Sequence, residues 1–311
     1  MAGRIRDDQL EPSIVMQMNQ RHDFEQESNC PLCFEASPIL NKIQSFKNNH
    51  DVFNYYKCFK CQLIFLGEKY HQFNNNTFKY IPIENNLEEQ NEFFSGNDYY
   101  KDPNYMFSYW LNEKKQIVKF GYSKGKILDV GCAAGQFLDK FDNKFEKYGV
   151  ELSELASLAR EKNIEVFHQP IEQCELPDEH FDIITLYATI EHLSNPFHVV
   201  DVISQKLKKG GLFVLGTQNY NCLLTRIKGK YYDDYIPPEH LYLFSWYLWK
   251  RYLQKVNFKI IFKKYINGGY FFFKNKYLRY FELQFSKRIM NKYPLNQLPI
   301  YDHFYIYAQK Q

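Results

Sequence analysis

Residues Gly125–Gly135 read GKILDVGCAAG, and this stretch decides the fold class of the chain. The mostly apolar residues 127–130 predict a buried strand, and the small residues after them predict a tight turn. The next residues, Gln136–Phe141, predict the start of a helix. A strand, a tight turn and a helix N-terminus form the local architecture of a nucleotide-type cofactor site. Gly131 and Gly135 are expected to let the backbone approach a ligand closely, because a Cβ there would collide.

Two acidic residues indicate which kind of cofactor this is. Asp129 precedes Gly131 in the turn, and Ala133 stands where a dinucleotide site would have its middle glycine. Asp129 would repel a pyrophosphate and suits a cofactor that is cationic or carries an ammonium. Glu151 ends the next apolar segment, where a carboxylate can accept hydrogen bonds from the two hydroxyls of a ribose.

Apolar runs and helical patterns alternate through the rest of the chain. Strands are expected at Lys126–Val130, Lys147–Leu152, Ile164–Phe167, Phe181–Tyr187, Gly211–Gly216, Phe258–Lys264 and His303–Ala308. Helices are expected at Met106–Phe120, Gln136–Phe141, Glu154–Lys162, Pro196–Lys208 and Ser245–Val256. This alternation predicts an α/β fold with a mainly parallel sheet, helices on both faces and ligands beyond the carboxyl ends of the strands.

Four segments in order resemble the class I S-adenosylmethionine-dependent methyltransferases. They are the DVGCAAG turn at 129–135, the strand from Phe181, the EHL turn with its proline at 188–196, and the Gly-Gly turn and strand at 207–215. The resemblance implies a Rossmann-like sheet at 124–311, mostly parallel with its last strand antiparallel, and S-adenosyl-L-methionine as cofactor.

The same resemblance implies a set of cofactor contacts. They fall on Asp129, Gly131, Ala133, Gly135, Glu151, Leu152, Ile171 and Tyr187. The glycine turn shapes the methionine end, Glu151 holds the ribose, and Leu152 and Ile171 lie at the adenine. Tyr187, an aromatic residue at a strand end, either floors the methionine pocket or belongs to the core.

Two C-x-x-C units, Cys30–Cys33 and Cys58–Cys61, predict a closed structural zinc site with four thiolate ligands. The 24 residues between the units are long enough for a hairpin with its turn at 48–51. A small N-terminal unit has too little core to fold without such a staple. A redox dithiol and a chance pairing of buried thiols are the alternatives.

This front end resembles a bacterial subgroup of methyltransferases that carry an N-terminal zinc ribbon and are linked to sugar and surface-polysaccharide biosynthesis. The resemblance rests on the cysteine pairs, the apolar strand after them and Tyr99-Tyr100. The expected organisation is a mobile tail at 1–27, a zinc ribbon at 28–66, a connecting helical region at 67–123, and a methyltransferase domain at 124–311 with a basic aromatic insert at about 265–300.

Two histidines are candidates for the base that takes a proton from a hydroxyl acceptor. His192 follows Glu191 just past the fourth strand of the resemblance and is the first choice, with Glu191 orienting it. His240 lies in the long stretch after the fifth strand and is the second choice. Either histidine could instead tie a loop together by hydrogen bonds, and in some quinone-pathway relatives the Glu-His turn holds a cation.

Composition limits the partners. The formal net charge of +3 gives no overall attraction for nucleic acid, and the absence of a signal-peptide pattern predicts a cytoplasmic protein. The expected function is methyl transfer to a small-molecule or carbohydrate acceptor, most simply at oxygen. An RNA base methyltransferase with a zinc ribbon and a non-catalytic zinc module on a degenerate fold are the rivals. The basic aromatic segment 259–292 either covers an aromatic core as a solvated face or contacts an anionic membrane.

Overall fold

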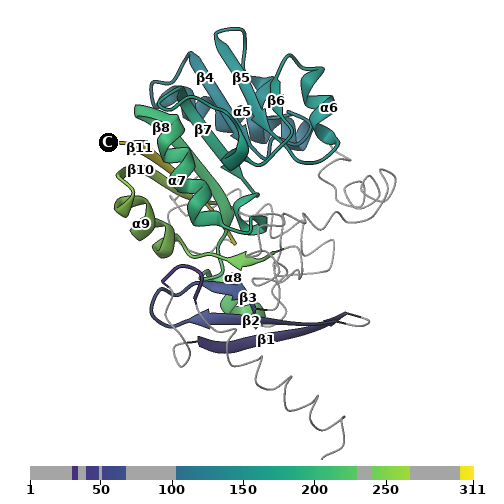
Figure 1. Ribbon diagram of the computed structural model, residues 1–311, viewed down its shortest axis with the longest axis vertical. Coiled ribbons are helices and arrows are strands. Elements are labelled where there is room, and N and C mark those ends of the chain that lie inside the picture. The colour runs from purple at the N-terminus through teal and green to yellow at the C-terminus, as the bar shows by residue number, and fades with distance from the viewer. Residues whose placement is uncertain (1–29, 34–39, 49–50, 68–102, 230–239, 267–301) are drawn as a thin grey trace, which may run out of the picture.

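The computed structural model describes residues 30–33, 40–48, 51–67, 103–229, 240–266 and 302–311 (Figure 1). The tail predicted at 1–27, most of the connecting region at 67–123 and nearly all of the basic aromatic insert therefore lie outside the described residues. No helix in the described part of the chain is long and apolar enough to cross a membrane.

A seven-stranded sheet forms the centre of the molecule, in the order β10-β11-β8-β7-β4-β5-β6. Its strands are β4 (Gly125–Val130), β5 (Phe145–Val150), β6 (Glu165–Phe167), β7 (Phe181–Tyr187), β8 (Leu207–Gln218), β10 (Phe258–Ile266) and β11 (His303–Lys310). The pairs β4–β5, β4–β7, β5–β6 and β7–β8 are parallel, whereas β11 runs antiparallel to both β8 and β10. The predicted fold class, with its antiparallel last strand, is confirmed.

Successive residues of a strand point to opposite faces of the sheet, and helices cover both faces. Leu128 packs in the same cluster as α7 (Pro196–Lys206) and α9 (Trp246–Lys255). Ile127 packs with α5 (Pro103–Lys119) and α6 (Leu155–Arg160). Side chains define the starts of α7 and α9, since Asn195 accepts a hydrogen bond from the His198 amide and Ser245 accepts one from the Leu248 amide.

The helix expected at Gln136–Phe141 is wrong. A single 3₁₀ turn, η2 (Leu138–Lys140), stands there instead. Phe137, Leu138 and Phe141 are all buried, and the Phe137 and Phe141 rings pack in the same cluster as Trp110 and Tyr187, so tertiary packing sets this segment and not a regular helix. Strand β5 already begins at Phe145, so the connection is also too short for a helix of ordinary length.

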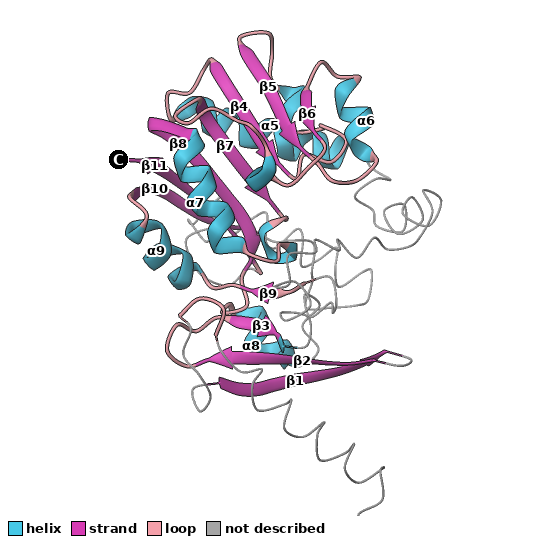
Figure 2. Ribbon diagram, in the orientation of Figure 1, coloured by secondary structure: helices cyan, strands magenta, loops and turns pink. Residues whose placement is uncertain are grey.

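A second, four-stranded sheet lies beside the first, in the order β1-β2-β3-β9 (Figure 2). The strands β1 (Leu40–Asn48) and β2 (Asp51–Cys58) form the expected hairpin, and β3 (Ile64–Leu66) pairs with β2. The fourth strand, β9 (Tyr242–Leu243), comes from the far end of the chain, after α8 (Leu223–Lys228). The sequence analysis did not anticipate this strand, because two residues carry no strand pattern.

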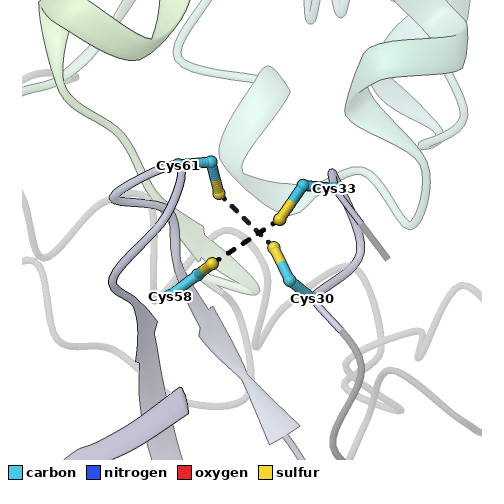
Figure 3. Close-up of side chains that lie close together, drawn as sticks. All are labelled: Cys30, Cys33, Cys58 and Cys61. Atoms are coloured by element: carbon cyan, nitrogen blue, oxygen red, sulfur yellow. Dashed lines mark hydrogen bonds between the residues drawn. The ribbon is translucent and has the colours of Figure 1, made fainter. Parts of the chain in front are cut away.

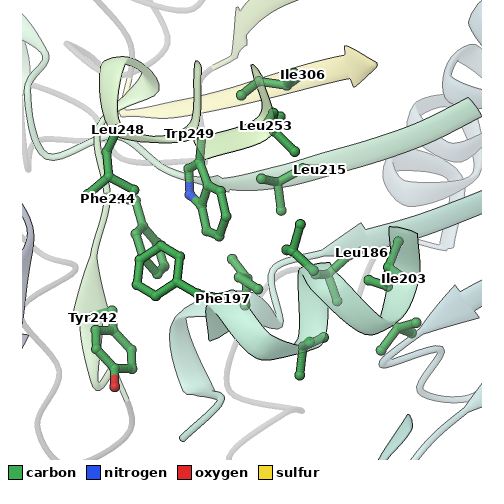
Figure 4. Close-up of a cluster of buried hydrophobic side chains, with 14 of the residues drawn as sticks. Leu186, Phe197, Ile203, Leu215, Tyr242, Phe244, Leu248, Trp249, Leu253 and Ile306 are labelled. Atoms are coloured by element: carbon green, nitrogen blue, oxygen red, sulfur yellow. The ribbon is translucent and has the colours of Figure 1, made fainter. Parts of the chain in front are cut away.

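The two sheets share one hydrophobic core. Tyr55 and Phe65 of the second sheet belong to the same buried cluster as α7 and α9. Figure 4 shows the junction, where Phe244, just after β9, packs on Trp249 with ring centroids 5.0 Å apart. The N-terminal segment is defined here as the described residues within 30–67. Its buried side chains thus pack against the rest of the molecule.

Candidate functional site

The loop after β4, residues 131–135, is called here the glycine loop. Gly131 and Gly135 have φ values of +79° and +73°, which favour glycine. A Cβ on Gly131 would lie 2.2 Å from the Thr189 hydroxyl, and one on Gly135 would lie 2.5 Å from Ile164. The sequence analysis expected these glycines to make room for a ligand, but the structure shows that the immediate neighbours are side chains of the protein. Close approach of a ligand to the glycine loop stays a prediction.

The carboxylate of Glu151 fastens the glycine loop to the end of β5. One oxygen accepts a hydrogen bond from the Ala133 amide at 2.8 Å, and the other accepts one from the Ser153 amide at 2.8 Å. Ala133 has a φ of +45°, so this bond stabilises an unfavourable backbone conformation. Each oxygen keeps a second lone pair. The predicted contact with a ribose is compatible with this placement and remains untested.

Asp129 lies just below the glycine loop, with only 4% of its surface exposed. Its carboxyl accepts a hydrogen bond from the Thr185 hydroxyl at 2.6 Å. Burial raises the pKa of Asp129 to about 8, the nearby Glu151 raises it further, and the Thr185 bond opposes the shift. A cation bound near this carboxyl would favour its charged form. The predicted contact of Asp129 with a cationic cofactor stays a prediction.

The other predicted cofactor contacts differ in accessibility. Ile171, in the 3₁₀ turn η3 (Ile171–Gln173), is buried in the main core, whereas Leu152 is partly exposed beside Glu151. Tyr187 packs in an aromatic cluster with Trp110 at 5.3 Å and Phe137 at 5.2 Å between ring centroids. Its buried hydroxyl has no hydrogen-bond partner among the described residues. The ring is thus part of the core, and the hydroxyl is a group that a ligand could satisfy.

The two candidate bases lie side by side. His192 ends the 3₁₀ turn η4 (Ile190–His192) after β7 and is exposed, and His240 is partly buried. Their ring centroids are 4.9 Å apart. The Leu241 amide donates to the Glu191 carbonyl at 2.9 Å, which holds the two chain segments together. The sequence analysis named each histidine singly and did not predict their contact, because they are 48 positions apart.

Glu191 completes this cluster. Only 2% of it is exposed, and its carboxylate accepts a hydrogen bond from the Thr217 hydroxyl at 2.9 Å. The carboxylate and one nitrogen of each histidine all lie within 4.8 Å of one another. This arrangement can orient an imidazole, and the same donor set could hold a divalent cation.

Two threonines with a role in the site were missed by the sequence analysis. Thr185 holds Asp129, and Thr217 holds Glu191. A signal existed for Thr185, which is a polar residue among the buried apolar residues of β7, and a weaker one for Thr217, which stands beside Gln218 at the buried end of β8. A buried hydroxyl needs a hydrogen-bond partner, so an isolated threonine in such a strand indicates a polar neighbour.

The four cysteines of the C-x-x-C units converge on one point (Figure 3). The sulfurs of Cys30 and Cys61 are 3.4 Å apart, those of Cys33 and Cys58 are 3.6 Å apart, and all four lie within 4.8 Å of one another. Tetrahedral zinc with Zn–S bonds of about 2.3 Å separates its sulfurs by about 3.8 Å. Both close pairs join one unit to the other, which argues against a dithiol within a single unit. The cluster is therefore compatible with a zinc site.

The seven-stranded sheet, mostly parallel with an antiparallel last strand, is the Rossmann-like fold of class I methyltransferases. The family model described as "Methyltransferase domain" matches residues 104–262, more than half of the chain, and the chain belongs to this family. A solved structure, the SAM-dependent methyltransferase from Archaeoglobus fulgidus, is similar with a TM-score of 0.50 and 18% identity, covering 70% of this chain and 99% of that one. At this identity the likeness shows the fold alone.

Two relatives illustrate the sequence similarity. The uncharacterized protein MJ1123 of Methanocaldococcus jannaschii is 27% identical over 139 residues, which is 40% of this chain and 66% of that protein. The ubiquinone biosynthesis O-methyltransferase of Alkalilimnicola ehrlichii is 31% identical over 110 residues, 32% of this chain and 44% of that protein. The chain thus spans at most two thirds of the length of these relatives. The N-terminal segment lies outside the region that the family model matches.

Proposed function

We propose that this protein transfers a methyl group from S-adenosylmethionine to a hydroxyl of a small-molecule or carbohydrate acceptor. The observation that carries the proposal is the pair of imidazoles, His192 and His240, beside the Glu191 carboxylate. The turn η4, which bears Glu191 and His192, begins directly after Thr189, whose side chain lies against Gly131 of the glycine loop. The base and the predicted cofactor site are therefore neighbours.

The residues have distinct tasks in this reaction. When bound, the cofactor supplies a methyl group on a positively charged sulfur. Asp129 and the glycine loop hold its amino-acid end, and Glu151 holds its ribose. His192 is exposed, so it can reach an acceptor and take the proton from the hydroxyl as the oxygen attacks. His240 and Glu191 orient this ring and stabilise its protonated form.

Transfer to oxygen is supported by the relatives. Several are named ubiquinone biosynthesis O-methyltransferase, and another is named malonyl-[acyl-carrier protein] O-methyltransferase 2. A carbohydrate acceptor rests on the resemblance of the cysteine-bearing front end alone. A cytoplasmic location belongs to the proposal and rests on sequence. Retained affinity for bulk RNA at physiological salt would favour the RNA base methyltransferase instead.

We propose further that Cys30, Cys33, Cys58 and Cys61 hold one structural zinc ion. Hydrogen bonding between Cys30 and Cys61 lowers the pKa of the first thiol to about 5 and raises that of the second. A cation at the centre of the cluster would favour the thiolate form of all four ligands. All four positions are occupied by protein ligands, so the ion would stabilise the fold and take no part in methyl transfer.

The test is turnover, followed as S-adenosylhomocysteine release with polyhydroxyphenol and nucleotide-sugar acceptors. With an accepted substrate, His192→Gln is expected to lower kcat at least about 100-fold, the usual contribution of a general base. Cofactor affinity should change less than twofold. His198→Gln, an exposed histidine on α7, is the matched control and should keep full activity.

Full turnover by both His192→Gln and His240→Gln would contradict the proposal. If EDTA instead abolished wild-type turnover and Mg²⁺ restored it, the three residues would act as cation ligands. If S-adenosylmethionine gave no thermal shift at all, the non-catalytic alternative would take its place.

A further inference from the structure

A buried tyrosine of the N-terminal segment reaches the histidine pair. Tyr55 lies on β2 and is 0% exposed. Its hydroxyl donates a hydrogen bond to the backbone carbonyl of His240, with an O···O distance of 2.6 Å. The two residues are 185 positions apart, so this is a contact between the first and last thirds of the chain. A ring this buried holds its hydroxyl in a fixed position.

Backbone bonds extend the same connection. The Leu66 amide donates to the Leu241 carbonyl at 2.8 Å, next to the pairing of β3 with β9. The Leu241 amide donates in the opposite direction, to the Glu191 carbonyl at 2.9 Å. Residues 240–241 are thus held between the N-terminal segment on one side and the turn that carries His192 on the other.

We propose that Tyr55 is a positioning residue, which sets His240 against His192 for the acceptor side of the reaction. This inference rests on the proposed function for its catalytic meaning, but the placement of His240 does not. The hydroxyl of Tyr55 bonds to the His240 carbonyl and not to the glycine loop or Glu151, so we expect it to act on the acceptor side and to leave cofactor binding unchanged.

The cysteine cluster is connected to the same two strands that hold residues 240–241. Cys58 ends β2, three residues after Tyr55, and Cys61 follows in the turn that leads to β3. The Cys58 amide donates to the Leu63 carbonyl and the Gln62 amide donates to the Cys58 carbonyl, which closes this turn between β2 and β3. A metal that fixes the four sulfurs therefore fixes both strands that hold residues 240–241.

The chain offers a matched control for the hydroxyl. Tyr220 also donates a hydrogen bond from one part of the molecule to a backbone carbonyl of the N-terminal segment, at 3.0 Å to Gln62. This bond goes to Gln62 and not to His240. Tyr55→Phe and Tyr220→Phe each remove one such bond, but only the first removes a bond to a histidine of the pair.

The experiment is NMR of the zinc-loaded, full-length protein with ¹³C-labelled histidine. Variants His192→Gln and His240→Gln assign the two Cε1–H signals. Tyr55→Phe is expected to shift both signals and the pH midpoints of their titrations, whereas Tyr220→Phe leaves them in place. S-adenosylmethionine affinity should stay within twofold in both variants. With an accepted substrate, Tyr55→Phe should lower kcat about tenfold, as expected for one buried hydrogen bond, and displace the pH–rate profile.

A second measurement needs no mutation. Removing the metal from the wild type with a chelator, below the unfolding temperature, should shift the same two histidine signals while S-adenosylmethionine still binds. Unchanged histidine signals in Tyr55→Phe, or after chelation, would overturn the inference. Shifted signals together with full turnover of His192→Gln would retain the positioning role and reject the base assignment.

Discussion

The burial of the Asp129 carboxyl has a consequence for the stability of the protein. Its pKa is raised to about 8 in the fold, from an ordinary value of 3.8, chiefly by burial. Between these pH values the folded protein keeps a proton that the unfolded chain has lost. The free energy of unfolding therefore falls as pH rises through this range. An asparagine cannot ionise and carries no such penalty.

We predict that Asp129→Asn raises the melting temperature of the cofactor-free protein by a few degrees at pH 8 to 9. The gain should shrink as the pH falls, and it should vanish below the ordinary pKa of 3.8, where the aspartic acid is protonated in both states. The same variant should bind S-adenosylmethionine at least tenfold more weakly, because a charged partner is lost. Differential scanning calorimetry across pH and isothermal titration calorimetry measure the two effects.

The control for this prediction is Asp139→Asn. The Asp139 side chain is 45% exposed and pairs with Lys140 at 3.2 Å, so its removal should leave the pH dependence of melting unchanged. If Asp129→Asn were less stable than the wild type at every pH, the burial argument would be wrong.

At the scale of elements, the close contact between the glycine loop and Thr189, which precedes the turn η4, can be tested by substitution. Gly131 and Gly210 have nearly equal φ values, +79° and +73°, yet their surroundings differ. A Cβ on Gly131 would lie 2.2 Å from Thr189, whereas one on Gly210 would meet nothing within 4 Å. Gly210→Ala therefore measures backbone strain alone, and Gly131→Ala measures strain and collision together.

We predict that Gly210→Ala lowers the free energy of unfolding by about 1 kcal/mol and keeps S-adenosylmethionine binding. Gly131→Ala should cost at least about 1 kcal/mol more and impair binding, because either the loop or η4 must move. Adding Thr189→Ala to Gly131→Ala should recover part of the loss, since it removes the two closest atoms. Urea denaturation measures these free energies of unfolding. Equal losses for Gly131→Ala and Gly210→Ala would show that the collision with Thr189 does not destabilise the fold.

The elements also show what sequence can predict. The strands β4, β7 and β8 were predicted within a few residues, because each contains a buried apolar run, and such a run is a local signal. The segment Gln136–Phe141 failed for the converse reason. Its apolar residues resemble one helix face, but Phe137 and Phe141 are drawn into the aromatic cluster around Trp110 and Tyr187. Tertiary packing there outweighs a pattern only six residues long.

At the scale of the whole molecule, the sequence analysis missed contacts between distant segments. It predicted the cysteine units, the histidines and the cofactor loop one by one. The strand β9 connects the segment that bears the cysteine units to the segment that bears His240. A strand of two residues has no local sequence pattern that predicts its partner. The contact between His192 and His240 follows from this pairing and from the bond of Leu241 to Glu191. Pairings of this kind are set by the complete fold and carry no sequence period.

The shared core leads to a prediction about unfolding. Residues of the N-terminal segment such as Tyr55 and Phe65 lie in the same buried cluster as Trp249 of α9. A sheet that takes its fourth strand from the other half of the chain cannot unfold without exposing that half. The zinc-loaded protein should therefore melt in one transition, seen alike by calorimetry and by tryptophan fluorescence.

Metal removal should then destabilise the entire molecule. Elemental analysis is expected to find one zinc per chain, and chelation should lower the single melting temperature by about 10 °C, since a site saturated about a thousandfold above its dissociation constant contributes about 4 kcal/mol. Cys58→Ser should lack the metal, melt at the lower temperature and ignore the chelator. Two transitions, the upper one unmoved by chelation, would instead make the cysteine-bearing segment an independent unit, and the link from the metal to His240 would then have no structural basis.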